Sequence, residues 1–150
     1  MSGPGARADG AGPAAALAKP FPPDDPVTAP FWEAARQRRL VAPRCRACGL
    51  VFLYPRVTCP GCLGREFDWL DLSGRGRVYS CTVVRQAAHP AFAAEVPYVF
   101  AVVQLDEGPR MATNVVGCPP EDVAPDQPVE VVFDEIGEGN VVPRFRPVAP

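Results

Sequence analysis

Two short cysteine motifs constrain the fold of this chain more than any other feature. Cys45-Arg-Ala-Cys48 and Cys59-Pro-Gly-Cys62 are separated by residues 49–58. Two residues between paired cysteines let one tight turn direct both sulfurs at a single ion. Four thiolates from two such turns form the closed tetrahedral arrangement of a structural zinc site. The sequence therefore predicts a zinc ion bound by these four cysteines, with iron as a less favoured alternative because four thiolates suit both metals.

Disulfide bonds are the other common use of paired cysteines, and they depend on the compartment. The N-terminus lacks a charged start followed by an apolar stretch, so no secretory signal is expected. The longest apolar stretch, residues 96–105, contains Pro97 and Gln104 and is shorter than the roughly 20 residues that span a bilayer. We therefore expect a cytoplasmic protein without a membrane segment, in which free thiols or metal ligands are commoner than disulfides.

A short helix is predicted over residues 28–40, just before the first cysteine motif. Thr28 can cap the helix, and Pro30 suits its first turn. A helix of about a dozen residues is marginal in isolation, so it must pack on something. Its aromatic residues Phe31 and Trp32 are candidates for two roles, packing on the chain's own ribbon or barrel, or docking onto a partner protein.

The residues between and beside the cysteines predict the shape of the ribbon. Gly49 can adopt the positive φ needed where the chain leaves the first motif, and residues 50–58 are strand-like, so we expect them to form the hairpin that brings the two motifs together. Four thiolates around a divalent ion carry a formal negative charge. The basic residues that can neutralise it are Arg44, Arg46, Arg56 and Arg65.

Five short strands are predicted in the second half of the chain. The 20 prolines and 13 glycines argue against a helical bundle, and alternating stretches rich in β-branched and aromatic residues follow Trp69. Five short strands joined by loops of mixed length fit a small closed barrel. Pro143 would mark the last strand as an edge. The expected strands cover residues 77–85, 97–106, 110–116, 128–133 and 140–145.

These elements divide the chain into three parts. Residues 1–26 are rich in Pro, Gly and Ala, bury too little apolar surface to offset their ordering entropy, and are expected to form a disordered tail. Within it, Phe21 is the candidate anchor if the tail binds a partner. Residues 27–70 would form the helix and zinc ribbon, and residues 71–150 the barrel.

The sequence offers no arrangement of residues for catalysis. His89 is the only histidine and lies beside a proline, and none of the common nucleophile or phosphate-binding motifs is present. Cys81 is expected to be a buried small hydrophobe. Cys118 would need a nearby histidine or helix N-terminus to be a reactive thiol.

Charge is divided unevenly between the two halves. Residues 31–77 contain nine arginines against four acids, whereas residues 78–150 contain four arginines against ten acids. A zinc ribbon followed by a barrel makes a nucleic-acid-binding protein an alternative, but the acidic barrel has the wrong sign for a phosphate backbone. An independent acyl-CoA-binding protein or hydrolase is the other alternative.

The order of motifs resembles a known family. The resemblance rests on Pro30-Phe-Trp-Glu, the two cysteine motifs, Ser73-Gly-Arg-Gly-Arg-Val-Tyr-Ser, His89-Pro-Ala-Phe and Val96-Pro-Tyr. In this order they resemble the acyl-CoA-associated OB-fold family with an N-terminal rubredoxin-like zinc ribbon, over about residues 27–147. One departure is Leu63, because glycine is more usual directly after the last cysteine.

The resemblance implies both a fold and a function. The implied fold is mainly β: a short N-terminal helix, a zinc ribbon and a five-stranded OB-fold barrel. The implied function is a non-catalytic accessory subunit that binds and stabilises a thiolase-like enzyme, aldolase or thiolase, and helps hold or channel its acyl-CoA substrate in steroid or lipid side-chain degradation. Phe31 and Trp32 would then contact the partner. His89 and Phe92 would line the acyl-CoA path or a partner surface, unless they only fix a loop.

Overall fold

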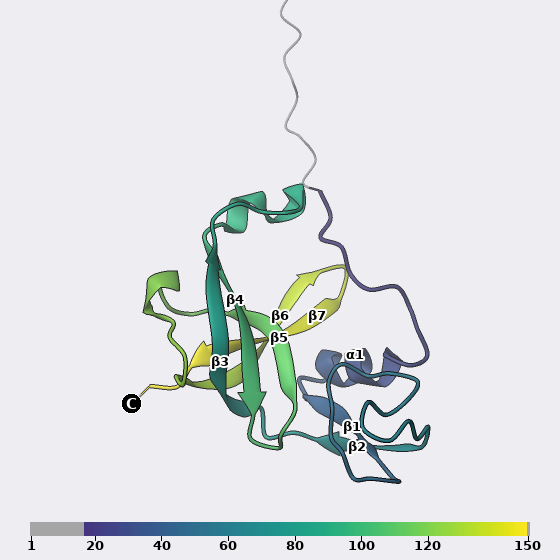
Figure 1. Cartoon of the computed structure of the whole chain (residues 1–150). Helices are drawn as coiled ribbons and strands as arrows, with labels where there is room; N and C mark the ends of the chain where they lie inside the picture. Colours follow the sequence, from purple (N-terminus) through teal and green to yellow (C-terminus); the bar gives the residue numbers. More distant parts are fainter. Residues whose placement is uncertain (1–16, 150) are drawn as a thin grey trace, which may run out of the picture.

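The computed structural model describes residues 17–149 and consists mostly of strands (Figure 1). It confirms the expected mainly-β fold, with one short α-helix, a cysteine ribbon and a closed five-stranded barrel. In chain order the elements are α1 (Ala29–Arg36), β1 (Val41–Cys45), β2 (Phe67–Asp71), β3 (Arg75–Val84), the 3₁₀ helix η1 (Pro90–Glu95), β4 (Tyr98–Leu105), β5 (Arg110–Val115), the 3₁₀ helix η2 (Pro120–Asp122), β6 (Pro128–Gly137) and β7 (Asn140–Pro147).

The barrel closes in the order β3-β4-β5-β7-β6. Neighbouring strands are antiparallel except β5 and β7, which meet in parallel at Val115 and Phe145. β6 extends four residues further than the sequence predicts, to a two-residue turn where Glu138 and Gly139 both have positive φ, and β7 extends two residues further at its other end, to Pro147. The prediction that Pro143 marks an edge strand is wrong, because β7 lies between β5 and β6 in the closed barrel. β7 pairs with β5 only at Phe145, so Pro143 lies outside that pairing.

Gly76 lies where β3 crosses close to β4. A Cβ atom at this position would overlap the carbonyl oxygen of Gln104, which belongs to the backbone of β4 and cannot rotate away. We predict that Gly76→Ala lowers the free energy of unfolding by about 1–3 kcal/mol, as overpacking does elsewhere. Chemical denaturation would measure this loss. Ser80→Ala, at an exposed position of the same strand, is the control, and an equal loss there would contradict the steric explanation.

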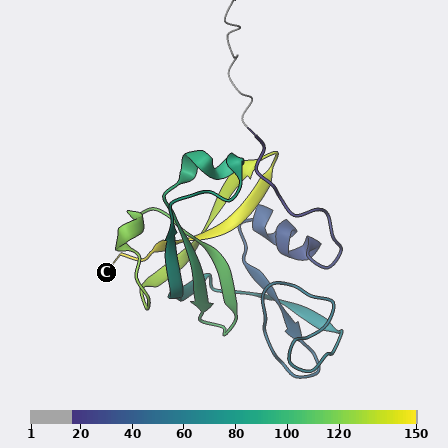
Figure 2. The same ribbon diagram turned by 45° about the horizontal axis from the view of Figure 1, so that its top comes forward.

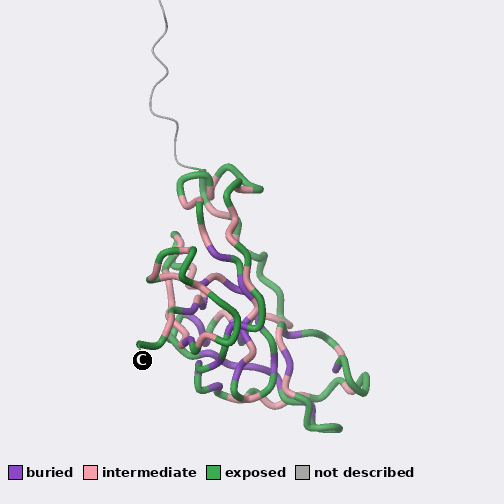
Figure 3. Tube along the Cα trace, turned by 60° about the vertical axis from the view of Figure 1, so that its left-hand side comes forward, coloured by how far each residue is buried: buried purple, intermediate pink, exposed green. Residues whose placement is uncertain are grey.

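One hydrophobic core joins the barrel to the ribbon. Phe145, Val103 and Val78 fill the barrel interior, and Phe31 of α1 and Ala42 of β1 belong to the same buried cluster. Figure 3 shows the buried positions gathered inside the barrel and where it meets the ribbon. Buried residues on both sides of the predicted boundary at residue 70 therefore belong to the same cluster.

The helix ends four residues earlier than expected. Its last residue is Arg36, and Arg38 then adopts φ 58°. The N–H of Arg38 donates to the carbonyl of Ala35, and that of Arg39 to the carbonyl of Ala34. This is the Schellman motif that terminates helices, usually built on glycine. Because arginine takes the glycine position, the sequence carried no stop signal there. Thr28 does occupy the N-cap position, as predicted, but its side chain makes no capping hydrogen bond.

The ribbon hairpin is not made from the residues between the cysteine motifs. β1 and β2, which flank the motifs, pair from Val41↔Asp71 to Cys45↔Phe67. The predicted strand over residues 50–58 is wrong, because only Val51 forms a β-bridge there. Part of this segment contacts the barrel instead. The hydroxyl of Tyr54 donates to the carbonyl of Ala112 on the barrel at 2.6 Å, and burial raises its pKa to about 12.

The N-terminal segment that the structure describes, residues 17–28, lies against the folded body (Figure 2). It contains no strand, but Phe21 packs on Trp32 with ring centroids 4.8 Å apart, and Lys19 forms an ion pair with Glu95. Most of the tail predicted as disordered, residues 1–16, lies outside the described residues. Within residues 17–149, no helix has the length and apolar character needed to cross a membrane.

Candidate functional site

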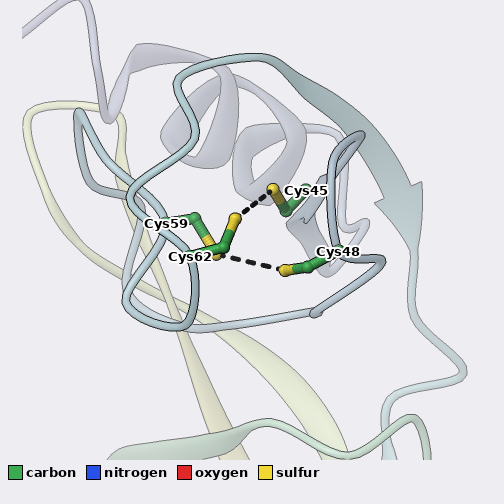
Figure 4. Close-up of side chains that lie close together, drawn as sticks. All are labelled: Cys45, Cys48, Cys59 and Cys62. Carbon is green, nitrogen blue, oxygen red and sulfur yellow. Dashed lines mark hydrogen bonds between the residues drawn. The ribbon is translucent and has the colours of Figure 1, made fainter.

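The four cysteines of the two motifs lie together at one end of the ribbon (Figure 4). Their sulfurs are all within 4.8 Å of one another, and the Sγ atoms of Cys45 and Cys62, and of Cys48 and Cys59, are 3.6 Å apart. Four sulfurs bound to one ion at about 2.3 Å lie about 3.8 Å apart in a tetrahedron. The separations are too long for disulfide bonds, for which sulfurs lie about 2 Å apart. The cluster thus has the dimensions of a four-thiolate metal site.

The two motifs are near-identical turns. The N–H of Gly49 donates to the carbonyl of Cys45, and that of Leu63 donates to the carbonyl of Cys59. Gly49 has φ 75°, as expected, and Leu63 has φ 63°. The departure from the family pattern at Leu63 therefore leaves the turn intact, with leucine held in a backbone conformation that suits glycine.

Leu63 is the position where a substitution should stabilise the ribbon. Its side chain is 74% exposed, so Leu63→Gly removes backbone strain and little packing. Strain relief outweighs the greater flexibility of glycine in the unfolded chain, and we predict a gain of about 0.5–1 kcal/mol. Thermal unfolding of the metal-loaded protein would measure it. Val57→Gly, also at an exposed position but without positive φ, should destabilise. A loss of stability in both variants would contradict the strain argument.

The electrostatics of the sulfur cluster favour a bound cation. Desolvation raises the pKa of Cys59. Hydrogen bonds from the backbone of Cys62 and Gly61 and from the neighbouring thiols outweigh desolvation and lower this pKa to about 7. A backbone hydrogen bond at Gly64 lowers the pKa of Cys62, yet the neighbouring thiols raise it to about 12. Without an ion, like charges prevent all four groups from ionising together. A divalent cation removes that conflict.

One of the four arginines expected to neutralise the thiolates, Arg46, pairs with a carboxylate. Arg46 pairs with Asp68 at 2.7 Å, joining β1 to the start of β2. None of the ion pairs in the described part of the chain uses Arg44, Arg56 or Arg65. Arg56 and Arg65 line a 320 Å³ groove on the ribbon together with the ring of Trp69.

The two aromatic residues of α1 have different environments. Phe31 is 1% exposed and belongs to the core, so it has no surface to offer a partner, which corrects that prediction. The alternative expectation, packing on the chain's own body, describes Phe31. Trp32 is partly exposed, and its ring contacts the rings of Phe21 and Phe31. A partner contact for Trp32 stays a prediction.

The loop with the single histidine borders a pair of cavities. His89 is exposed, and its Nδ1 accepts the N–H of Ala91 at 3.1 Å, so it caps η1 and fixes the loop. Phe92 lines two cavities, of 210 and 200 Å³. Asn114 of β5 and Arg144 of β7 also line both cavities. Sequence reasoning missed these two residues because an isolated polar side chain in a strand gives no signal until the barrel closes.

No catalytic arrangement forms around the remaining thiols among residues 17–149. Cys81 is half-buried and packs against the core, with its sulfur 3.6 Å from the carbonyl oxygen of Val123. Burial, and to a lesser degree Asp122, raise the pKa of Cys118. Reactive cysteines need the opposite shift, because the thiolate is the nucleophile.

Comparison with protein families matches both halves of the chain. The rubredoxin-like zinc ribbon domain of ChsH2 matches residues 32–68, and the C-terminal OB-fold domain of ChsH2 matches residues 69–134. The two matches are adjacent and cover the ribbon and most of the barrel. They confirm the resemblance drawn from the motifs.

Several curated proteins are similar to this chain. A probable enoyl-CoA hydratase alpha subunit from Thermomonospora curvata is 43% identical over 121 residues, which are 80% of this chain and 37% of that protein. A DUF35 domain-containing scaffold protein from Methanocaldococcus jannaschii is 36% identical, over 83% of this chain and 93% of the scaffold protein. A benzoylsuccinyl-CoA thiolase subunit, BbsA, from Thauera aromatica is 33% identical over 51% of each chain.

A solved structure shares the whole architecture. It is described as an Ltp2-ChsH2(DUF35) aldolase, and the matched chain is 40% identical to this one. The superposition has a TM-score of 0.76 and covers 85% of this chain and 98% of that chain. With the two family matches, this shows that the chain belongs to the ChsH2 family, in which a rubredoxin-like zinc ribbon precedes an OB-fold domain.

Proposed function

We propose that this protein is a non-catalytic accessory subunit that binds and stabilises a thiolase-like enzyme, thiolase or aldolase. The observation that carries the proposal is the similarity over nearly the whole length of a chain from an aldolase complex. Relatives described as a thiolase subunit and as a scaffold protein support the same role. Two residues of the described chain agree with a non-catalytic role. His89 caps η1 in a loop, and the pKa of the Cys118 thiol is raised, so neither is placed for catalysis.

The metal in this proposal is zinc with a structural role. All four ligands would be cysteines, which leaves no open position for water or substrate. The ion would fix the ribbon, and the ribbon would hold α1 and β1 against the barrel core. Free cysteines of this kind need a reducing compartment, which supports a cytoplasmic location.

The barrel cavities are our candidate for the place where acyl-CoA is held. They lie beside η1 and the β6–β7 hairpin, on strands β4 and β5, which is the face where OB-folds commonly bind ligands. Glu95, Asp134 and Arg144 gather there, so the site is not basic enough for a nucleic acid. Steroid or lipid side-chain degradation is the proposed pathway, and it follows from the family resemblance.

Co-expression with the thiolase-like protein encoded nearest to this one tests the proposal. Size-exclusion chromatography with light scattering should give a single hetero-oligomer. The complex should catalyse thiolysis or retro-aldol cleavage that the enzyme alone performs poorly. Two separate peaks with unchanged enzyme activity would refute the accessory role. Turnover of acyl-CoA by this chain alone, lost in His89→Ala, would support a hydrolase, and steeply salt-dependent oligonucleotide binding would support a nucleic-acid-binding protein.

A further inference from the structure

The 320 Å³ groove on the ribbon, which we call the ribbon groove, combines an apolar surface with positive charge. Its walls include the exposed side chains of Trp69 and Val57. Among the described residues, Arg56 and Arg65 are the only charged ones that line it, and neither belongs to an ion pair there. Exposed apolar surface of this kind commonly marks a site of protein–protein contact.

Residues 22–26, Pro-Pro-Asp-Asp-Pro, form an acidic segment that precedes α1. All five residues are exposed, and neither Asp24 nor Asp25 forms an ion pair within the described part of the chain. Proline fixes its own φ and keeps the residue before it extended. The acidic segment is therefore stiff, so it would lose little conformational entropy on binding.

The acidic segment does not fill the ribbon groove of its own chain. Asp24 and Asp25 line a different cavity, of 380 Å³, together with Glu33 of α1. Only Pro26 of the segment lines the ribbon groove. Pro30 lines both cavities, so the segment and the groove lie next to each other around the start of α1. Figure 2 shows the N-terminal segment curving round this end of the helix, beside the ribbon.

The ribbon groove and the acidic segment match each other chemically. Arginine guanidinium groups bind carboxylates, and proline-rich segments dock into grooves lined by aromatic rings such as that of Trp69. A two-fold dimer needs a single patch that is complementary to itself. Because the groove and the segment are neighbours, one two-fold rotation can place the segment of each copy in the groove of the other.

We propose that the ribbon groove binds the acidic segment of a second copy of this chain, so that the protein forms a two-fold dimer. In each of the two equivalent contacts, Asp24 and Asp25 pair with Arg56 and Arg65, and the prolines pack on Trp69. Salt screens attraction between exposed charges, so the dimer should weaken as ionic strength rises. The proposal concerns this chain alone and does not depend on its role beside a thiolase-like enzyme.

Sedimentation of the full-length, metal-loaded protein over a range of concentrations tests the proposal. The unaltered chain should pass from monomer to dimer as its concentration rises. Two variants should each weaken dimerisation by more than about tenfold, because like charges would then face each other. The groove variant is Arg56→Glu with Arg65→Glu. The segment variant is Asp24→Arg with Asp25→Asn, which keeps an acceptor for the N–H of Val27.

A mixture of the two variants gives the most specific result. In a mixed dimer the reversed groove meets the reversed segment, and the unaltered groove meets the unaltered segment, so dimers should return on mixing. Arg44→Glu with Arg75→Glu is the matched control, because both arginines are exposed, lie outside the groove and the segment, and form no ion pair in the described chain. This control should dimerise as the unaltered protein does, and equal metal content would show that every variant is folded.

Four results would overturn the proposal. The first is a monomer at every concentration, and the second is a dimer that the groove variant leaves intact. The third is that the two variants, with full metal content, stay monomeric when mixed. The fourth is a monomeric chain whose groove variant no longer binds the thiolase-like enzyme on co-expression, which would assign the ribbon groove to that enzyme. Failure of the accessory role itself would leave the dimer unchanged, so the two proposals are tested separately.

Discussion

Cys59→Ser is expected to abolish metal binding and to unfold the ribbon. The Cys59 sulfur is completely buried, and it lies within 4.8 Å of the other three sulfurs. A serine hydroxyl is a poor ligand for a thiophilic ion, and three thiolates cannot close the tetrahedron. Binding of structural zinc is worth on the order of 10–16 kcal/mol in small zinc peptides, so the ribbon, with a small core of Cys45, Phe52 and Cys59, should not fold without it.

Elemental analysis would measure the loss as a fall from about one ion per chain to almost none. Because the ribbon and the barrel share a core, the melting temperature of the whole protein should also fall. Cys118→Ser is the matched control, since Cys118 is half-buried but lies outside the cluster. Full metal content in Cys59→Ser would show that the cluster is not the metal site.

Phe31→Ala should be among the most damaging changes outside the metal site. Phe31 is 1% exposed and contacts the ring of Tyr54 edge-to-face, with centroids 5.6 Å apart, at the junction of helix, ribbon and barrel. Removing a buried phenyl ring costs about 3–5 kcal/mol, through lost burial and the cavity that remains. That is a large part of the 5–15 kcal/mol that stabilises a typical domain.

Denaturant unfolding with the metal bound would measure this change. Phe100→Ala is the matched control, because Phe100 is 45% exposed; we expect it to cost less than about 1 kcal/mol. Equal losses in the two variants would mean that Phe31 does not join the two halves of the fold. If Phe31→Ala kept its stability but lost a partner enzyme, the original expectation of a docking residue would return.

The local patterns of the chain determined most of its architecture. The spacing of Cys45, Cys48, Cys59 and Cys62 identified the metal cluster, because two residues between ligands already fix a turn. The alternation of apolar side chains identified all five barrel strands, because a side-chain period of two is a property of the strand itself. Gly49 was identified as a positive-φ position from its place after a cysteine motif.

Only the tertiary structure decided how these pieces fit together. Tyr54 reaches across to the barrel, so the segment between the cysteine motifs contacts the barrel as well as the ribbon. Arg38 ends the helix with a positive φ, a conformation that an arginine in the sequence does not predict. Phe31 is part of the core, whereas its neighbour Trp32 lines the 200 Å³ cavity between α1, β5 and β7.

The difference between the two kinds of information is physical. Turns, ligand spacing and strand alternation depend on interactions between residues a few positions apart, so the sequence alone determined the ribbon motifs and the strands. This 200 Å³ cavity is lined by Trp32, Phe92 and Arg144, which are far apart in the chain. Their meeting depends on closure of the barrel and on packing of α1 against β7, so the position and the lining of this cavity were decided by the tertiary structure.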